Sequence, residues 1–188
     1  MGTHNHGQGH ETIFRQMLAD MLGLEFEQVR LAQGDSDVSM MGTGTFGSRS
    51  SGVGGASIQL AAKKIVEKCK PLVAHHLEVA VQDIEFDDGT FTVAGTDKTM
   101  SLIDAAKTAH NFMTAPPDFE LGLDEWAAWS PPAPTFPNGC HVAEVEIDPD
   151  TGRTEIVRYC MVDDVGTVIN PLLLEGQVHG GAVQGIGP

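Results

Sequence analysis

A proline-rich segment divides this 188-residue sequence into two parts. Residues 114–138 hold six of the ten prolines and few apolar residues at regular spacing. Proline fixes φ and removes a backbone donor, so such a run neither continues a helix nor joins the middle of a sheet. We therefore expect an extended connector over 114–138, with folded segments before it, 1–113, and after it, 139–188.

Hydrophobic spacing predicts helices and strands on both sides of this connector. The expected helices cover residues 11–24, ending near Gly23; Ile58 to Cys69, limited by Pro71; Ser101 to about Ala109; and a stretch beginning near Leu172. The expected strands are Val29–Ala32, a hairpin of 84–86 and 91–93 that turns at Asp88-Gly89, and the pair 140–147 and 154–162. Because no strand leads directly into a phosphate-binding loop, we expect an α+β fold and not a doubly wound parallel sheet.

Charge and cysteine content limit the possible partners. The net charge is −15, from 26 acidic residues against 11 Lys and Arg, which argues against nucleic-acid binding. No apolar run is long enough to span a bilayer and no signal-peptide pattern opens the chain, so a cytoplasmic location is expected. The spacing of Cys69, Cys140 and Cys160 fits neither an iron–sulfur nor a zinc site, and each is expected to be a small buried apolar residue.

The first segment that could bind a ligand is His6-Gly7-Gln8-Gly9-His10-Glu11-Thr12, which runs into the first predicted helix. Glycines allow backbone N–H groups to approach a ligand, and a helix N-terminus favours an anion. A metal site formed by His4, His6 and His10 is an alternative, but no carboxylate or cysteine nearby completes a ligand set. We prefer histidines that are exposed to solvent or bonded to a ligand.

The second segment, residues 42–52, contains Gly47-Ser48-Arg49-Ser50 and runs into the second predicted helix. Hydroxyl groups, an arginine and flexible backbone before a helix favour phosphate binding. No Gly-Lys-Ser/Thr occurs, so this is not a Walker loop. A flexible Ser/Gly linker fits poorly, because the run leads directly into a helix and carries an arginine.

The third segment extends from Asp163-Asp164 through Asn170-Pro171 to Gln177. Paired carboxylates can bind metal or transfer protons, but at the end of a strand we expect them to cap a turn or a helix. Asn170-Pro171 predicts a helix start. Gln177 lies among glycines, where a cofactor could approach.

These three segments, in this order, resemble the second molybdopterin-binding domain of the molybdenum hydroxylases, the family of xanthine dehydrogenase, aldehyde oxidase and aerobic carbon monoxide dehydrogenase. The sequence of residues 47–50 is most similar to that of the bacterial carbon monoxide dehydrogenase-like branch, whose cofactor is molybdopterin cytosine dinucleotide. The resemblance implies that the chain binds molybdenum only through this cofactor. It implies contacts with the cofactor from Gln8, Gly9, His10, Thr12, Gly47, Ser48, Arg49, Ser50 and Gln177.

The resemblance also implies an activity for the whole protein. The family hydroxylates an aldehyde or an N-heterocycle, or oxidises carbon monoxide, with oxygen from water. Electrons pass to iron–sulfur clusters and FAD on partner subunits or domains of a heteromeric complex. The general base is a glutamate that we expect beyond Pro188; Glu175 is not its equivalent.

Both ends of the sequence are rich in glycine, so we expect a fragment truncated at both ends and inactive by itself. The alternatives are a non-catalytic nucleotide- or metal-binding module and an inert truncated product. The residues present leave the choice among carbon monoxide, aldehydes and N-heterocycles open.

Overall fold

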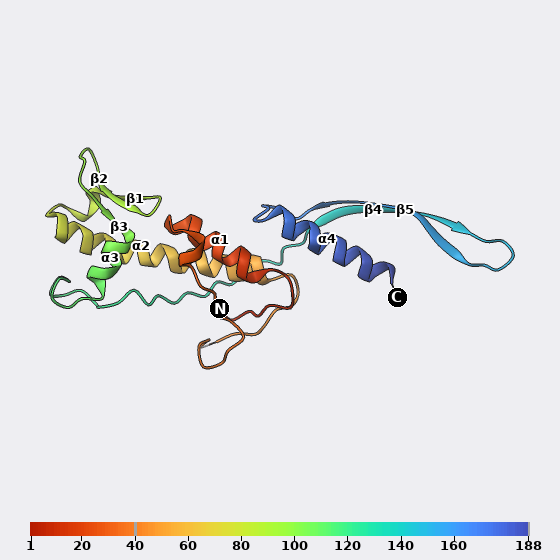
Figure 1. Cartoon of the computed structure of the whole chain (residues 1–188), viewed down its shortest axis with the longest axis horizontal. Helices are drawn as coiled ribbons and strands as arrows, with labels where there is room; N and C mark the ends of the chain where they lie inside the picture. The colour runs from red at the N-terminus through yellow and green to blue at the C-terminus, as the bar shows by residue number, and fades with distance from the viewer. Residues whose placement is uncertain (40, 188) are drawn as a thin grey trace. The chain divides into compact units, whose positions relative to one another are not determined.

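The computed structural model describes residues 1–39 and 41–187, which form two compact units that divide after Ser130. Helices and strands follow in the order α1 (His10–Leu22), α2 (Ala56–Leu77), β1 (Ile84–Asp87), β2 (Thr90–Val93), β3 (Thr99–Ser101), α3 (Leu102–Ala109), β4 (Asn138–Ile147), β5 (Thr154–Asp164) and α4 (Pro171–Ile186) (Figure 1). Both sheets are antiparallel, so the expected α+β class is confirmed. Among the described residues, no helix has the length and apolar character to cross a bilayer.

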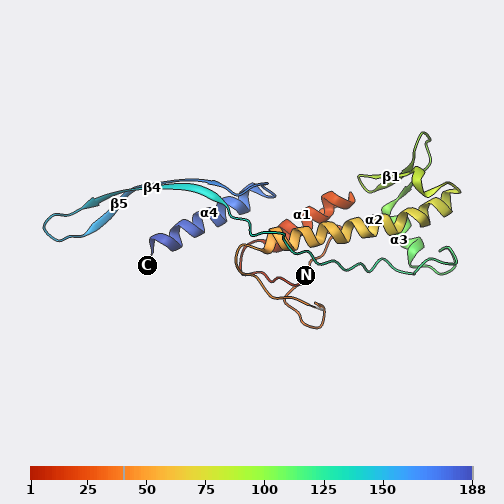
Figure 2. The same cartoon turned by 180° about the vertical axis from the view of Figure 1, so that it is seen from behind.

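The first unit is built around α2. Figures 1 and 2 show α1 alongside α2, and the sheet β1-β2-β3 at the C-terminal end of α2. Leu72 and Val73 of α2 are fully buried, together with Phe91 of β2 and Ala105 of α3. The core therefore lies between α2, the small sheet and α3.

Helix α2 passes through Pro71, contrary to the prediction that this proline would limit it. A proline inside a helix removes one hydrogen bond and costs about 3 kcal/mol. The three residues that follow, Leu72, Val73 and Ala74, are at most 2% exposed, and a buried Leu or Val side chain contributes about 1.5–3 kcal/mol. Burial of the last turns of α2 thus offsets the cost of Pro71.

The predicted strand Val29–Ala32 is wrong, although its backbone begins in an extended conformation. Val29 has φ −97° and ψ 130° and follows a 3₁₀ turn, Phe26–Gln28. Within residues 1–39 and 41–187 no strand pairs with this segment; the Ala32 carbonyl instead accepts a hydrogen bond of 2.7 Å from the Met1 amino group. Conversely, β3 was not predicted, because three residues are too few to show a period.

One predicted helix end and one predicted turn are confirmed. Gly23 ends α1 in the left-handed conformation, with φ 60° and ψ 44°. Asp88 and Gly89 have φ values of 40° and 74°, and they connect β1 to β2 in the register predicted for a two-residue hairpin turn.

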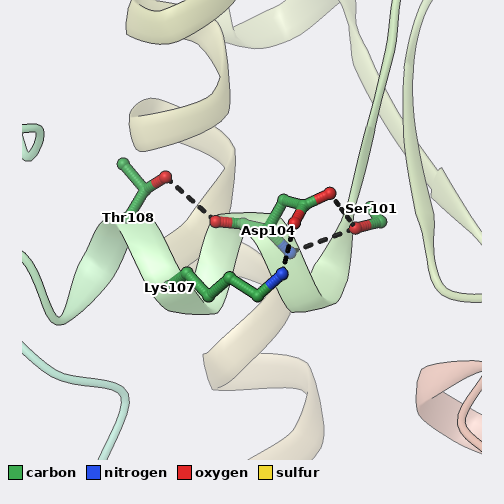
Figure 3. A network of polar contacts seen from close by, with 4 residues as sticks. All are labelled: Ser101, Asp104, Lys107 and Thr108. Carbon is green, nitrogen blue, oxygen red and sulfur yellow. Dashed lines mark hydrogen bonds and ion pairs between the residues drawn. The ribbon is translucent and has the colours of Figure 1, made fainter.

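Ser101 caps the start of α3, at the position where the sequence predicted that this helix begins. Its Oγ accepts a hydrogen bond of 3.0 Å from the Asp104 amide and donates one of 2.8 Å to the Asp104 carboxylate (Figure 3). Lys107 Nζ donates to the same carboxylate at 2.8 Å. The bond from Lys107, together with the bond from Ser101, lowers the pKa of Asp104. The first turn of α3 is therefore held by side chains.

Replacing Ser101 with alanine is expected to lower the free energy of unfolding by about 1 kcal/mol, the usual value of an N-cap. Ser101→Asn, which keeps a capping oxygen, should lose much less. Urea denaturation of the three proteins measures the difference. An alanine variant as stable as the wild type would show that this cap contributes nothing.

The second unit consists of the ribbon β4-β5 and helix α4. The strands pair from Asn138↔Asp164 to Ile147↔Thr154, with a register shift between Glu144 and Val145. None of residues 131–187 is buried, so hydrogen bonds and not a core maintain the ribbon. Cys140 and Cys160 lie on this ribbon and are exposed, contrary to expectation, whereas Cys69 in the first unit is buried, and burial raises its pKa to about 11.

Candidate functional site

The first glycine loop ends at an open helix start. Gly9, with φ 78° and ψ 28°, is the N-cap of α1, and no side chain among the described residues caps this end. Ile13 makes the first α-helical bond, to the Gly9 carbonyl at 3.1 Å. The backbone amides of the first turn therefore point outward from a helix end that favours negative charge.

The second glycine loop also ends at an uncapped helical turn. Gly47 and Ser48 have φ values of 57° and 55°, and Arg49 precedes a π-helical turn, Ser50–Gly55, that continues into α2. A left-handed conformation costs a non-glycine residue about 1–2 kcal/mol. Strain of this kind at Ser48 is typical of loops whose backbone is arranged for a ligand.

Arg49 bends back over its own loop. Its Nη1 donates to Thr43 Oγ1 and contacts the Gly44 carbonyl at 3.4 Å. The guanidinium carbon lies 5.0 Å from the centre of the Phe46 ring. The arginine thus braces the loop 43–49 and places a permanent positive charge beside the start of α2.

Hydrogen bonds join the two loops to each other. The His4 amide donates to Thr45 Oγ1 at 3.1 Å, and the same hydroxyl donates to the His4 carbonyl at 2.7 Å. The Gly44 amide donates to the Gly2 carbonyl at 3.2 Å. The residues just before the first predicted segment are therefore bonded to the second segment, although about forty positions separate them.

Two glycines allow the starts of α1 and α2 to approach. A Cβ atom on Gly54 would lie 3.1 Å from Phe14 Cζ, and one on Gly55 would lie 2.8 Å from Met17 Cε. Both glycines are buried. The uncapped starts of α1 and α2 consequently lie at the same end of the first unit (Figure 1).

His10 is 1% exposed, unlike the neighbouring His4 and His6, which are exposed. Among the described residues, neither ring nitrogen has a hydrogen-bond partner of acceptable geometry, although the Gln33 amide is near. Burial, reinforced by the charges of His6 and His4, lowers the pKa of His10 against the opposing effect of Gln33. A Gln33 side chain can serve only one ring nitrogen at a time, so this buried imidazole still has a nitrogen available for a bound polar group.

Because the pKa of His10 is lowered, we expect the folded protein to become less stable as the pH falls. The unfolded histidine takes up its proton near pH 6.5, whereas the folded one does so only at lower pH. The free energy of unfolding should therefore decrease as the pH falls below about 6.5, by at most about 1.4 kcal/mol per pH unit for one proton. Denaturation at pH 7.5 and 5.5 measures this. The pH effect should shrink in His10→Gln but not in the matched exposed variant His75→Gln, and an equal effect in all three would contradict it.

Gln8 is half-buried and faces His6. Its Oε1 accepts from the His6 amide, and its Nε2 lies 3.2 Å from His6 Nδ1. His4 and His6 stack edge to face, with ring centres 4.0 Å apart. In the part of the chain that the structure describes, no three His, Cys, Asp or Glu side chains are arranged to hold a metal ion.

A cavity of about 250 Å³ lies between the first residues of the chain and the segment that carries the second loop. Thr3, His4, Asp35, Ser39 and Gly44 are among its lining residues. Thr3 Oγ1 is buried and, among the described residues, has no hydrogen-bond partner. The Thr3 hydroxyl in this cavity is therefore still available for hydrogen bonding.

Gln177 belongs to the second unit. It is exposed on α4, whose start is capped by Asn170, since Leu173 N donates to Asn170 Oδ1 at 3.1 Å. The predicted helix start at Asn170-Pro171 is thus confirmed. Asp164 caps a turn as expected, because its Oδ1 accepts from the Gly166 amide at 3.0 Å.

Asp163 does not cap a turn but bonds across the ribbon. His141 Nε2 lies 3.0 Å from Asp163 Oδ1, and His141 Nδ1 lies 2.9 Å from the Tyr159 hydroxyl. Neither His141 nor Tyr159 was predicted as a site residue from the sequence. Even pairing outward from the turn 148–152 would have placed His141 opposite Cys160, on the other face from Tyr159 and Asp163. The register shift between Glu144 and Val145 brings all three to one face.

A molybdopterin cofactor carries phosphate and polar pterin groups, and the residues present fit such a group. Two uncapped helix starts, the Arg49 guanidinium and the unpartnered imidazole of His10 lie on the joined loops. These are donors of the kind that phosphate and pterin acceptors require. No side chain of this chain needs to bind the metal directly, because molybdenum would be bound through the cofactor.

Comparison with known proteins agrees with this fit. Residues 1–188 match the molybdopterin cofactor-binding domain family. The chain is 41% identical over 186 residues to the carbon monoxide dehydrogenase large chain of Hydrogenophaga pseudoflava, covering 98% of this chain and 23% of that protein. It is 38% identical over 188 residues to the nicotine 6-hydroxylase large subunit of Paenarthrobacter nicotinovorans, covering 99% of this chain and 23% of that subunit.

Solved structures give the same result. The chain superposes on the crystal structure of the Cu,Mo-CO dehydrogenase in its carbon monoxide reduced state with a TM-score of 0.87 and 40% identity, covering 96% of this chain and 23% of that one. Quinoline 2-oxidoreductase from Pseudomonas putida 86 gives a TM-score of 0.85 and 38% identity, over 98% of this chain and 24% of that one. The chain spans about a quarter of the length of these relatives. It belongs to the molybdopterin cofactor-binding domain family.

Proposed function

We propose that residues 1–188 are the cofactor-binding portion of the large subunit of a molybdenum-dependent oxidoreductase. The observation that carries the proposal is the joining of two glycine loops at the uncapped starts of α1 and α2. The relatives named for carbon monoxide, nicotine and quinoline support an oxidoreductase of this class. Its substrate is an aldehyde, an N-heterocycle or carbon monoxide, with oxygen supplied by water.

Each loop has its own role in the proposed site. Gln8 lies beside the molybdenum ligands, and the start of α1 with Gly9, His10 and Thr12 receives phosphate groups. The second loop, Gly47-Ser48-Arg49-Ser50, holds the pterin and the dinucleotide, and Gln177 bonds near the pterin dithiolene. The bound cofactor supplies the redox chemistry, whereas these residues bind it, orient it and neutralise its charge.

The cofactor is proposed to be the cytosine dinucleotide form of molybdopterin. Electrons leave through iron–sulfur clusters and FAD on partner subunits of a cytoplasmic complex. The glutamate that acts as general base is proposed to lie outside residues 1–188. Residues 1–188 therefore supply cofactor binding, and catalysis belongs to the full-length protein.

Metal analysis of the purified full-length protein tests the proposal. Molybdenum at about one atom per large subunit, together with a released pterin, is the expected result. Zinc, or no metal, in an intact and fully folded protein would contradict it and favour a nucleotide- or metal-binding module. Dye reduction with carbon monoxide, an aldehyde or an N-heterocycle then identifies the substrate class.

Gln8→Ala in the full-length protein is expected to reduce turnover while leaving the fold intact. Loss of a neutral hydrogen bond costs about 0.5–1.5 kcal/mol, so a decrease of roughly twofold to tenfold is expected. Steady-state turnover and molybdenum content are measured in the same preparation. Unchanged turnover at normal molybdenum content would remove Gln8 from the site.

A further inference from the structure

A Tyr–His–Asp group crosses the ribbon of the second unit. Met161 lies opposite His141 in the register, and Gly139 lies opposite Asp163, so His141, Tyr159 and Asp163 share one face. The imidazole bonds to both partners, at 2.9 Å to the Tyr159 hydroxyl and at 3.0 Å to the Asp163 carboxylate. We call these three residues the ribbon clasp.

Gly139 makes room for the clasp. A Cβ atom at this position would lie 2.2 Å from Asp163 Oδ1 and 2.9 Å from the Val162 carbonyl oxygen. Asp163 Oδ1 is the oxygen that bonds to His141. The carboxylate therefore occupies space over the opposite strand that only a glycine leaves free, and the direction of the Asp163 side chain is set by the backbone across from it.

Burial does not set the register of this ribbon. None of its residues is buried, and a strand exposed on both faces specifies its register weakly. The register already shifts once, between Glu144 and Val145. The clasp lies between this shift and the open end of the ribbon, and there it ties β5 to β4 through side chains.

A short series of local bonds leads from the clasp to α4. Asp163 is followed directly by Asp164, whose carboxylate accepts from the Gly166 amide at 3.0 Å. Gly166 has φ 78°, and the Asn170 side chain then caps α4. Gln177 lies about two turns into that helix. The clasp therefore lies directly before the segment 164–170 that leads into the helix carrying Gln177.

We propose that His141 is a positioning residue: by bonding to Tyr159 and Asp163 it holds the end of β5, and thereby the turn 164–170 and the helix that presents Gln177. The role of Gln177 in this inference rests on the proposed function. The effect of the clasp on the turn 164–170 does not depend on it. His141 contacts neither Gln177 nor the cofactor in this scheme.

Hydrogen–deuterium exchange of backbone amides 165–173 in the full-length protein tests the clasp. His141→Ala removes both bonds, and Gly139→Ala displaces the carboxylate; each should speed exchange about tenfold. Tyr159→Phe, the mildest change, should give a smaller increase. Asp163→Asn, which keeps the Oδ1 acceptor, should rescue the slow exchange that Asp163→Ala loses.

Arg153→Ala is the matched control on the same ribbon. It breaks the ion pair of Arg153 with Glu155 at the other end, beyond the register shift, and should leave exchange at 165–173 unchanged. Unchanged exchange in both His141→Ala and Tyr159→Phe would overturn the proposal. So would an equal increase in Arg153→Ala, or failure of Asp163→Asn to rescue.

Cofactor content of the same proteins separates this inference from the proposed function. If Gln177→Ala retains the molybdenum cofactor fully, the proposed contact of Gln177 is wrong, and exchange alone decides the clasp. If Gln177→Ala loses the cofactor, His141→Ala should lose it too, with Asp163→Asn again protecting. Suppose that Gln177→Ala loses the cofactor, while His141→Ala shows faster exchange but keeps its full cofactor content. This result would overturn the positioning of Gln177 by the clasp.

Discussion

Gly23→Ala is expected to destabilise the first unit by more than about 3 kcal/mol, because two costs combine at this position. Gly23 has φ 60°, a conformation that alone costs alanine about 1–2 kcal/mol. The added Cβ would also lie 2.1 Å from the Asp88 carbonyl carbon and 2.1 Å from the Gly89 nitrogen. These are backbone atoms of the β1–β2 turn, so they cannot move away as a side chain would, and the end of α1 must separate from the hairpin.

Gly95→Ala provides the matched control. Gly95 has φ 74°, but no atom lies within 4 Å of its added Cβ, so only the conformational cost of about 1–2 kcal/mol applies. Urea denaturation of the wild type and both variants measures the difference. Equal losses at the two positions would show that the contact of Gly23 with the turn is not rigid.

Arg49→Ala is expected to weaken cofactor retention by roughly tenfold or more, the effect of one lost charge-assisted contact of about 1.5–3 kcal/mol. Arg49→Lys should fall between alanine and the wild type, because lysine keeps the charge but loses the planar fork. Cofactor content of the full-length protein after gel filtration measures retention. Equal retention in all three proteins would count against a contact with phosphate.

Thr43→Ala separates the two possible actions of Arg49. The guanidinium donates to Thr43 Oγ1, so this variant loosens the loop and leaves the positive charge in place. Retention in Thr43→Ala should stay near that of the wild type if Arg49 contacts the cofactor directly. A loss as large as that of Arg49→Ala would mean that the arginine acts by holding its loop.

Features that depend on neighbouring residues were predictable from the sequence. The helix starts at Ser101 and Asn170, the helix end at Gly23 and the turn Asp88-Gly89 all appear where the sequence placed them. Each of them is a bond or a dihedral preference within a few residues. The α+β class followed from the same local signals, since periodicity distinguishes helices from strands.

Features that depend on distant partners were not predictable in the same way. Val29 is extended but lacks a neighbouring strand, and α2 continues through Pro71 because the next residues are buried. Cys140 and Cys160 are exposed because they lie on a two-stranded ribbon without a core of its own. In each case the outcome depended on what lies against the segment.

The candidate site likewise combines local sequence features with contacts between residues that are far apart along the chain. The sequence by itself determined which loops carry glycines, hydroxyls and an arginine before helices, because those are properties of short segments. Only the tertiary structure brought the loops together through His4 and Thr45, buried His10 without a partner, and joined His141 to Tyr159 and Asp163. Side chains far apart along the chain meet only after strands pair and helices pack, so their contacts are decided by the fold.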